Sequence, residues 1–248
     1  MRFKFAAVVL AALLLSAPLA FADTVVTIRS VSDGMPGAPG MAKDETSELW
    51  IAGDKFRKDA GEQSFVVDLE AQKLFIIDHS GKSCQTADLP LDLVKLVPEE
   101  MRGMFEQMAE RMNMQIEVTP TEEAREIAGY PAKLYRVKAR SDQGLELDQD
   151  LWMTEAVKFD VTGYKKMAEA LFSMQPIGAD WKKEILAIKG FPVLQETTVR
   201  MMGNEIKSRE ELISVEEKEA PAGAYAPPPD YEVKPFDFMA GFGPGGGR

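Results

Sequence analysis

The side chains that could do chemistry are few in this 248-residue sequence. The single histidine, His79, has no Gly-x-Ser-x-Gly phrase near it, so no nucleophile, base and orienting group for hydrolysis can be assembled from motifs. One histidine and one cysteine, Cys84, cannot supply the several ligands of a zinc site. We interpret His79 as a turn residue and Cys84 as a small residue on a strand. The sequence predicts neither an enzyme nor a bound cofactor.

Methionine is the one residue type here with an affinity for a metal. Five of the fourteen methionines fall between Met101 and Met114, and thioether sulfurs bind Cu(I). Met101, Met104, Met108 and Met112 also follow helical spacing, with polar residues between them. This spacing indicates the apolar face of an amphipathic helix that packs against other elements or lines a cavity. Cu(I) binding is the less favoured alternative.

The charge balance argues against one class of partner. The chain has 29 Lys+Arg and 40 Asp+Glu, and its basic residues are scattered, with no run longer than pairs such as Lys165-Lys166. An acidic chain without a basic patch is repelled by a phosphate backbone. Nucleic acid is therefore not an expected partner.

The N-terminus has the pattern of an export signal. Arg2 and Lys4 precede an apolar run over residues 5–15, and Ala20-Phe21-Ala22 matches a signal-peptidase site. We expect residues 1–22 to be cleaved and the mature chain to be exported, most simply to a bacterial periplasm, with no membrane span left. A lone cysteine forms no intramolecular disulfide, so a buried core must stabilise the mature chain. The sequence makes no prediction of the oligomeric state.

Short strand-forming runs that alternate with turn residues predict an antiparallel meander. The expected strands are 24–31, 48–52, 55–59, 64–68, 73–78, 82–86, 115–118, 133–138, 147–153, 194–202 and 206–215. Helices are expected at about 98–112, 163–174 and 180–188. Residues 23–218 would form the folded domain, because the Pro/Gly-rich composition of 219–248 predicts a largely flexible tail.

A short phrase occurs twice, as Gly129-Tyr130-Pro131 and as Gly190-Phe191-Pro192, each at the start of a strand-forming run. Glycine permits a positive φ, and proline fixes φ and removes an N–H donor. We expect both phrases to shape the beginning of a strand in one sheet.

Several short motifs, taken in order, resemble a family of exported bacterial proteins that share a domain of unknown function (4412). These motifs are Trp50 to Arg57, Gly129 to Lys133, Asp150 to Met153 and Pro221 to Tyr225. The family resembles the lipoprotein carriers of the periplasm (LolA-like and LolB-like). The resemblance implies an α+β fold: a strongly curved antiparallel sheet, an incomplete barrel, with helices packed on its concave face around an apolar cavity. No ligand-contacting residue of the carriers can be matched here.

A strongly curved sheet leaves more apolar lining than its own side chains fill, so helices or a ligand must cover it. We therefore predict a non-enzymatic carrier or binding protein for an amphiphile, either a lipid or an acylated protein. The predicted cavity residues are Trp50, Phe65, Phe75, Met104, Met108, Trp152 and Leu171. The alternative is a protein-interaction module, in which the loop 34–43 and the C-terminal tail contact an envelope protein.

Overall fold

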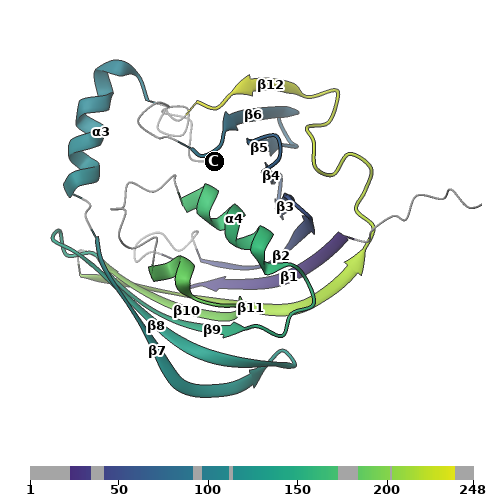
Figure 1. The fold of residues 1–248 in the computed structure, drawn as a ribbon. Coiled ribbons are helices and arrows are strands. Elements are labelled where there is room, and N and C mark those ends of the chain that lie inside the picture. Colours follow the sequence, from purple (N-terminus) through teal and green to yellow (C-terminus); the bar gives the residue numbers. More distant parts are fainter. Residues whose placement is uncertain are drawn as a thin grey trace, which may run out of the picture.

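The computed structural model describes residues 23–34, 42–91, 97–111, 114–172, 184–201 and 203–237. Within these residues, twelve strands form one curved sheet in the order β12-β6-β5-β4-β3-β2-β1-β11-β10-β9-β8-β7 (Figure 1). The described sheet is open, with β12 and β7 as its edges. This curved open sheet is the architecture that the resemblance to lipoprotein carriers implied.

The first part of the sheet is a meander in which β2 to β6 follow one another through short connections. Its strands are β1 (Asp23–Ser32), β2 (Lys43–Ala52), β3 (Lys55–Ala60), β4 (Gln63–Asp68), β5 (Lys73–Asp78) and β6 (Ser83–Asp88). Successive pairs are antiparallel, as predicted. Two of the connections, at residues 53–54 and 61–62, have two residues, a length that reverses the chain without splaying the strands.

The second part consists of longer strands. They are β7 (Met114–Ile127), β8 (Tyr130–Ser141), β9 (Glu146–Thr154), β10 (Phe191–Met201), β11 (Asn204–Lys218) and the short β12 (Glu232–Pro235). β11 pairs with both β10 and β1 and so joins the two parts into one sheet. The predicted curved antiparallel sheet is confirmed, although strands dominate the structure more than the predicted α+β class suggested.

Few helices accompany the sheet. They are α3 (Glu99–Arg111), α4 (Val161–Phe172) and a helical turn at 184–187, which is the described part of the helix predicted at 180–188. α4 lies within the curve of the sheet, whereas α3 stands to one side (Figure 1). Met104 of α3 is 58% exposed, so the predicted packing of the methionine face is wrong at this position. None of the described helices is long and apolar enough to cross a membrane.

Strand alternation divides the buried side chains of β3–β6 between two clusters. Phe56, Val67 and Leu74 belong to the main core, on the face that α4 covers with Met167. The intervening residues face the other way. There Val66, Ile77 and Cys84 form a second cluster with Tyr225 and Tyr231, which are far away in the sequence. Cys84 is a small buried strand residue, as predicted, and burial raises the pKa of its thiol.

Residues 219–237 lie against the sheet, in contrast to the flexible tail that composition predicted. Tyr225 and Tyr231 pack against the second cluster, and β12 pairs in parallel with β6. Two aromatic rings and a strand supply the packing area and hydrogen bonds that the Pro/Gly composition did not reveal. The described residues after 218 thus pack on the sheet, and residues 238–248 lie outside the described part of the chain.

The two Gly-aromatic-Pro phrases begin β8 and β10, as predicted. Gly129 has a φ of +78° in the tight turn before β8, with open space around it. Gly190 has a φ of +93°, and a Cβ there would lie 2.3 Å from the carbonyl oxygen of Thr154. The first glycine therefore serves a turn, whereas the second permits a close approach of two strands.

Candidate functional site

A cavity of ≈ 640 Å³ lies between α4 and the sheet. Its volume falls within the range of small-molecule sites in proteins. Most of its lining is apolar and comes from strands far apart in sequence. The apolar lining includes Ile28, Leu49, Phe56, Phe65, Val67, Leu74, Ile76, Met167, Phe191 and Leu212.

The register of β3, β4 and β5 builds one wall of this cavity. Directly opposed residues of neighbouring strands share a face of the sheet. Two such rows line the cavity, namely Phe56, Val67 and Leu74, and Lys58, Phe65 and Ile76. Residues two positions apart in each strand therefore form a continuous apolar surface with one lysine in it.

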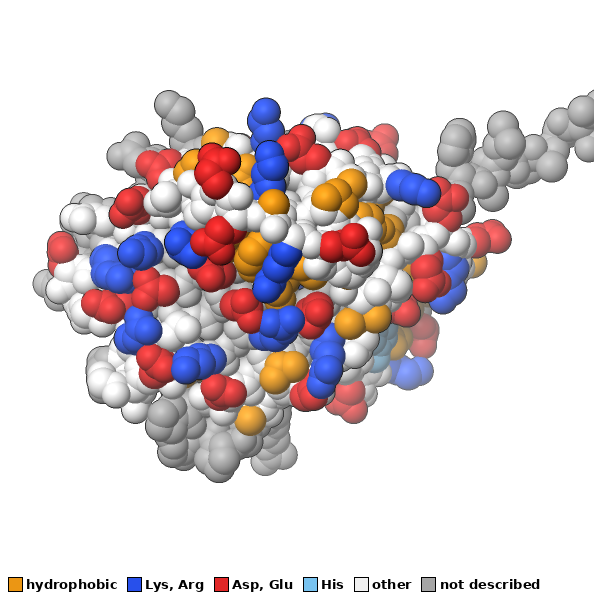
Figure 2. All heavy atoms as spheres, turned by 90° about the horizontal axis from the view of Figure 1, so that it is seen from below, with side chains coloured by type: hydrophobic (Ala, Val, Ile, Leu, Met, Phe, Trp, Pro, Cys, Tyr) orange, Lys and Arg blue, Asp and Glu red, His pale blue; other side chains and the backbone are white. Residues whose placement is uncertain are grey.

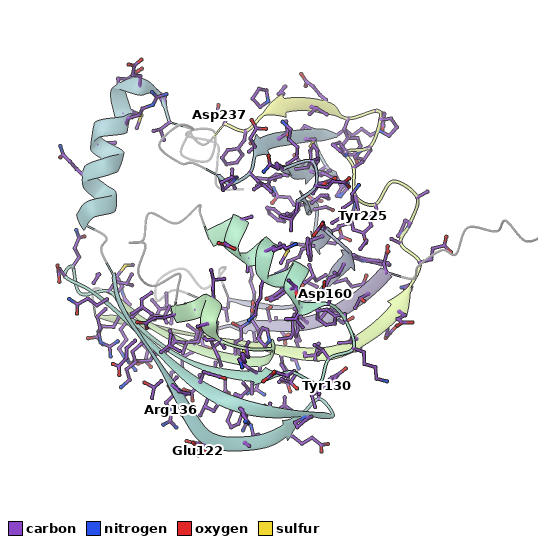
Figure 3. All side chains as sticks on the ribbon, in the orientation of Figure 1. Glu122, Tyr130, Arg136, Asp160, Tyr225 and Asp237 are labelled. Atoms are coloured by element: carbon purple, nitrogen blue, oxygen red, sulfur yellow. The ribbon has the colours of Figure 1, made fainter. Side chains whose placement is uncertain are left out.

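The opposite wall is positioned by α4. The carboxylate of Asp160 accepts a 2.8 Å hydrogen bond from the backbone N–H of Thr162, which caps the start of the helix and lowers the pKa of Asp160 (Figure 3). Tyr164 stacks edge-on against Phe191, with ring centroids 4.8 Å apart. Lys165 donates a 2.7 Å hydrogen bond to the carbonyl oxygen of Ile188. These contacts fix α4 against the start of β10.

Two acidic residues of the lining are already engaged by protein donors. Glu210 accepts hydrogen bonds from Ser30 Oγ at 3.3 Å and from Gln195 Nε2 at 3.1 Å. Glu211 accepts from Arg209 Nη2 at 3.1 Å. Burial, and to a smaller extent the charge of Glu210, raises the pKa of the Tyr164 phenol to about 12. The phenol is therefore neutral at physiological pH.

The predicted cavity residues of β2, β4 and β5 divide between the two faces. Phe65 lines the cavity. Phe75 packs in the second cluster, and Trp50 is buried on the same outer face, with Lys218 Nζ 5.4 Å from its ring centroid. Their assignment to the cavity is wrong because successive strand residues point to opposite faces, and Leu49, beside Trp50, already lines the cavity.

The other predicted residues do not line the cavity where the structure describes them. Trp152 is 6% exposed and belongs to the main core, where the guanidinium carbon of Arg125 lies 3.9 Å from its ring centroid. Met104 is exposed to solvent. The side chains of Met108 and Leu171 lie outside the described part of the structure. The interaction-module alternative depends on the loop 34–43 and the tail 219–248, of which residues 35–41 and 238–248 are likewise outside it.

A hydrogen-bonded network on the outer face includes the only histidine. Ser64 Oγ donates to Asp59 Oδ1 at 2.5 Å and accepts from Arg57 Nη2 at 2.9 Å. His79 joins Ser64 through Nε2 at 2.7 Å and Tyr231 through Nδ1 at 3.1 Å. His79 lies in a turn, as predicted, but its partners were not foreseen, because they come from β4 and from the segment after β11.

This serine–histidine pair has the geometry of a structural network. The one hydroxyl hydrogen of Ser64 is directed at Asp59, which assigns the donor role in the Ser64–His79 bond to Nε2. A catalytic base would have to accept the serine proton, with the carboxylate orienting the imidazole. Ser64 is also 1% exposed, so no substrate could reach it. The network instead attaches Tyr231 to the sheet.

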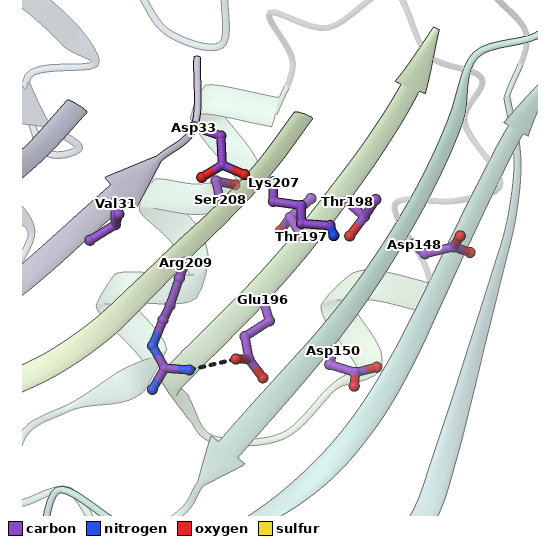
Figure 4. Close-up of a pocket in the computed structure, with 10 residues that line it drawn as sticks. All are labelled: Val31, Asp33, Asp148, Asp150, Glu196, Thr197, Thr198, Lys207, Ser208 and Arg209. Carbon is purple, nitrogen blue, oxygen red and sulfur yellow. Dashed lines mark hydrogen bonds and ion pairs between the residues drawn. The ribbon is translucent and has the colours of Figure 1, made fainter. Parts of the chain in front are cut away.

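The outer face of β8–β11 carries charged rows with alternating signs (Figure 2). A hollow of ≈ 360 Å³ on this side contains Asp150, Glu196 and Arg209. Arg209 Nη1 donates to Glu196 Oε1 at 2.5 Å (Figure 4), and Arg200 Nη1 lies 2.6 Å from Asp148 Oδ2. Because opposite charges already pair across the strands, this hollow is a weaker candidate for a ligand than the concave cavity.

Sequence reasoning missed several residues that form the cavity. Phe56 and Lys58 lie in a strand that was predicted at 55–59, two positions apart and therefore on one face. This two-residue spacing within the predicted strand could have placed both side chains on the same face. Met167 lies in a predicted helix, but its position against β3 and β10 depends on tertiary packing that no local pattern contains.

Comparison with known proteins gives one family match and several structural matches. The family model described as domain of unknown function (DUF4412) matches residues 42–231. No curated protein matches the chain. A crystal structure of MucB is 14% identical with a TM-score of 0.36, covering 86% of this chain and 60% of that chain. The Pseudomonas aeruginosa MucA/MucB complex is 15% identical with a TM-score of 0.39, covering 87% and 59%. The chain thus spans about 60% of the length of these structures.

Proposed function

Since this chain belongs to the family of domain of unknown function 4412, we propose that it is an exported, non-enzymatic binding protein whose concave cavity holds the apolar part of an amphiphile. The amphiphile is a lipid or an acylated protein. Export follows from the signal pattern of residues 1–22. The observation that carries the proposal is the ≈ 640 Å³ cavity with a mostly apolar lining.

The energetic reason lies in the incomplete burial of this lining. Phe65 and Ile76 line the cavity yet are only half-buried. An aliphatic chain placed against them removes apolar surface from water on both sides, with about 0.8 kcal/mol gained for each buried methylene. Several methylenes are enough to exceed the loss of translational and rotational freedom on binding. The cavity therefore favours a chain-like apolar group.

Two phenylalanines offer a matched test of this proposal. Phe65 lines the cavity, whereas Phe75, on the neighbouring strand, faces the second cluster on the outer side. Titration of the purified chain with a fluorescent fatty acid should show binding. Phe65→Ala should weaken it about tenfold, because roughly 1.4 kcal/mol of apolar contact is lost.

Phe75→Ala makes the same chemical change on the other face and should leave the probe affinity within about twofold of wild type. Thermal unfolding of both variants shows that each is folded at the temperature of the titration. Equal losses of affinity in the two variants would argue against the concave cavity as the binding site. Absence of probe binding to the wild-type chain would reject the proposed function.

A further inference from the structure

One charged side chain stands out in the cavity wall. Lys58 lies on β3 directly opposite Phe65 of β4, which is itself opposite Ile76 of β5, and all three line the cavity. The row is otherwise apolar at these positions. Lys58 is exposed, so its ammonium group lies at the mouth of the cavity while its aliphatic stem borders the apolar wall.

Among the described residues, Lys58 differs from the other charged residues of the lining in having no hydrogen-bond or ion-pair partner. Glu210 is bonded to Ser30 and Gln195, and Glu211 is bonded to Arg209. Within the described part of the chain, no hydrogen bond or ion pair engages Lys58. The chain has 40 acidic residues that could have paired with this lysine, and none of the described ones does. The ammonium group of Lys58 can therefore bind an anion beside the apolar cavity.

We infer that Lys58 binds the anionic head group of the amphiphile, a carboxylate or a phosphate, while the aliphatic chain lies along Phe65 and Ile76. This inference rests on the proposed function and specifies its ligand class. The bonded carboxylate of Glu210 lines the same cavity and repels a second negative charge. The anionic head group therefore lies at the Lys58 side of the cavity.

The test is calorimetric titration of the full chain with four probes, below the concentration at which they form micelles. The probes are dodecanoate, dodecyl phosphate, dodecanol and inorganic phosphate. Wild type should bind dodecanoate and dodecyl phosphate about tenfold more tightly than dodecanol. Comparison of the two anions identifies the preferred head group. Inorganic phosphate tests whether binding requires the aliphatic part of the probe.

Three substitutions separate the charge from other effects. Lys58→Gln should remove the preference for the anionic probes and leave dodecanol binding unchanged, and Lys58→Arg should retain the preference. Lys138→Gln removes the same charge from β8, outside the cavity lining, and should also retain it. Raising the salt concentration on wild type should weaken dodecanoate but not dodecanol binding, a readout that needs no variant.

The outcomes distinguish the two levels of the proposal. If Lys58→Gln binds all dodecyl probes as wild type does, the role of Lys58 is rejected while the cavity remains the binding site. If inorganic phosphate binds as tightly as dodecyl phosphate, the site binds an anion without any contribution from an aliphatic chain, and the inference is overturned. If no dodecyl probe binds wild type, the proposed function itself fails.

Discussion

The guanidinium of Arg57 donates a 2.8 Å hydrogen bond to the carbonyl oxygen of Ala224, 167 positions away in the sequence. This contact joins two motifs of the family resemblance, Trp50 to Arg57 and Pro221 to Tyr225, which the sequence alone left separate. The same guanidinium bonds to Asp59 at 2.8 Å. The two motifs thus describe one structural feature: the attachment of the segment after β11 to the outer face of the sheet.

Replacing Arg57 with Gln should lower the free energy of unfolding by about 1–3 kcal/mol, because a buried carbonyl and Ser64 lose a charged donor. Urea denaturation measures the change. Arg29→Gln is the control, since Arg29 and Asp44 form an exposed ion pair whose loss should lower the free energy of unfolding much less. Equal losses in the two variants would show that the Arg57 contacts contribute no more than a surface pair.

Two truncations compare the segment after β11 with the residues beyond it. A chain that ends at residue 218 lacks Tyr225, Tyr231 and β12, so it should melt at a lower temperature than the full chain. The fall should be several degrees, as expected for the loss of a few kcal/mol from a domain of this size. A chain that ends at residue 237 keeps these contacts. Equal melting temperatures for the two truncations would contradict the attachment.

Gly190→Ala should destabilise the protein by about 3 kcal/mol or more, because the new methyl group would meet the Thr154 carbonyl oxygen at 2.3 Å. Gly61→Ala is the control. Gly61 also has a positive φ, +60°, but no atom lies within 4 Å of a Cβ there, so only the backbone strain of about 1–2 kcal/mol remains. Chemical denaturation distinguishes the two, and a smaller loss for Gly190→Ala than for Gly61→Ala would contradict the close approach.

Stability should fall in alkaline solution, partly through Tyr164. Its pKa is raised from 10.0 to about 12 in the folded protein. Above pH 10 the unfolded chain loses the phenolic proton while the folded chain retains it, so the contribution of Tyr164 to stability is lost as the pH rises from 10 to 12. Tyr164→Phe should therefore show a shallower decline than wild type in urea denaturation over this range. Parallel declines would contradict the burial of this phenol.

Much of the sheet could be predicted because each short strand carries its own signal. The strand containing Phe56 is bounded by the turn residues Gly53 and Gly61, which are a local signal. The face on which a residue lies is also local in principle, since Leu49 and Trp50 must point in opposite directions. Which of the two faces is concave is not local, so alternation alone does not decide between Leu49 and Trp50.

The packing of the outer face and of α4 depends on contacts that no local pattern contains. The position of Tyr225 and Tyr231 on the outer face is determined by partners on β1 and at the end of β5, more than a hundred residues away. Composition after residue 218 therefore predicted flexibility where the structure has packing. Likewise, the place of Met167 above the sheet follows from how α4 enters the curve, which depends on the whole sheet.

The central claim, that the concave cavity holds an amphiphile, is tested most directly by analysing the protein as the cell produces it. The exported chain is purified without detergent, extracted with organic solvent and examined by mass spectrometry beside a mock purification. The account predicts an amphiphile with an aliphatic chain and an anionic head group, enriched with wild type and depleted with Phe65→Ala but not with Phe75→Ala. A wild-type protein that is reproducibly empty and takes up no fluorescent fatty acid would contradict it.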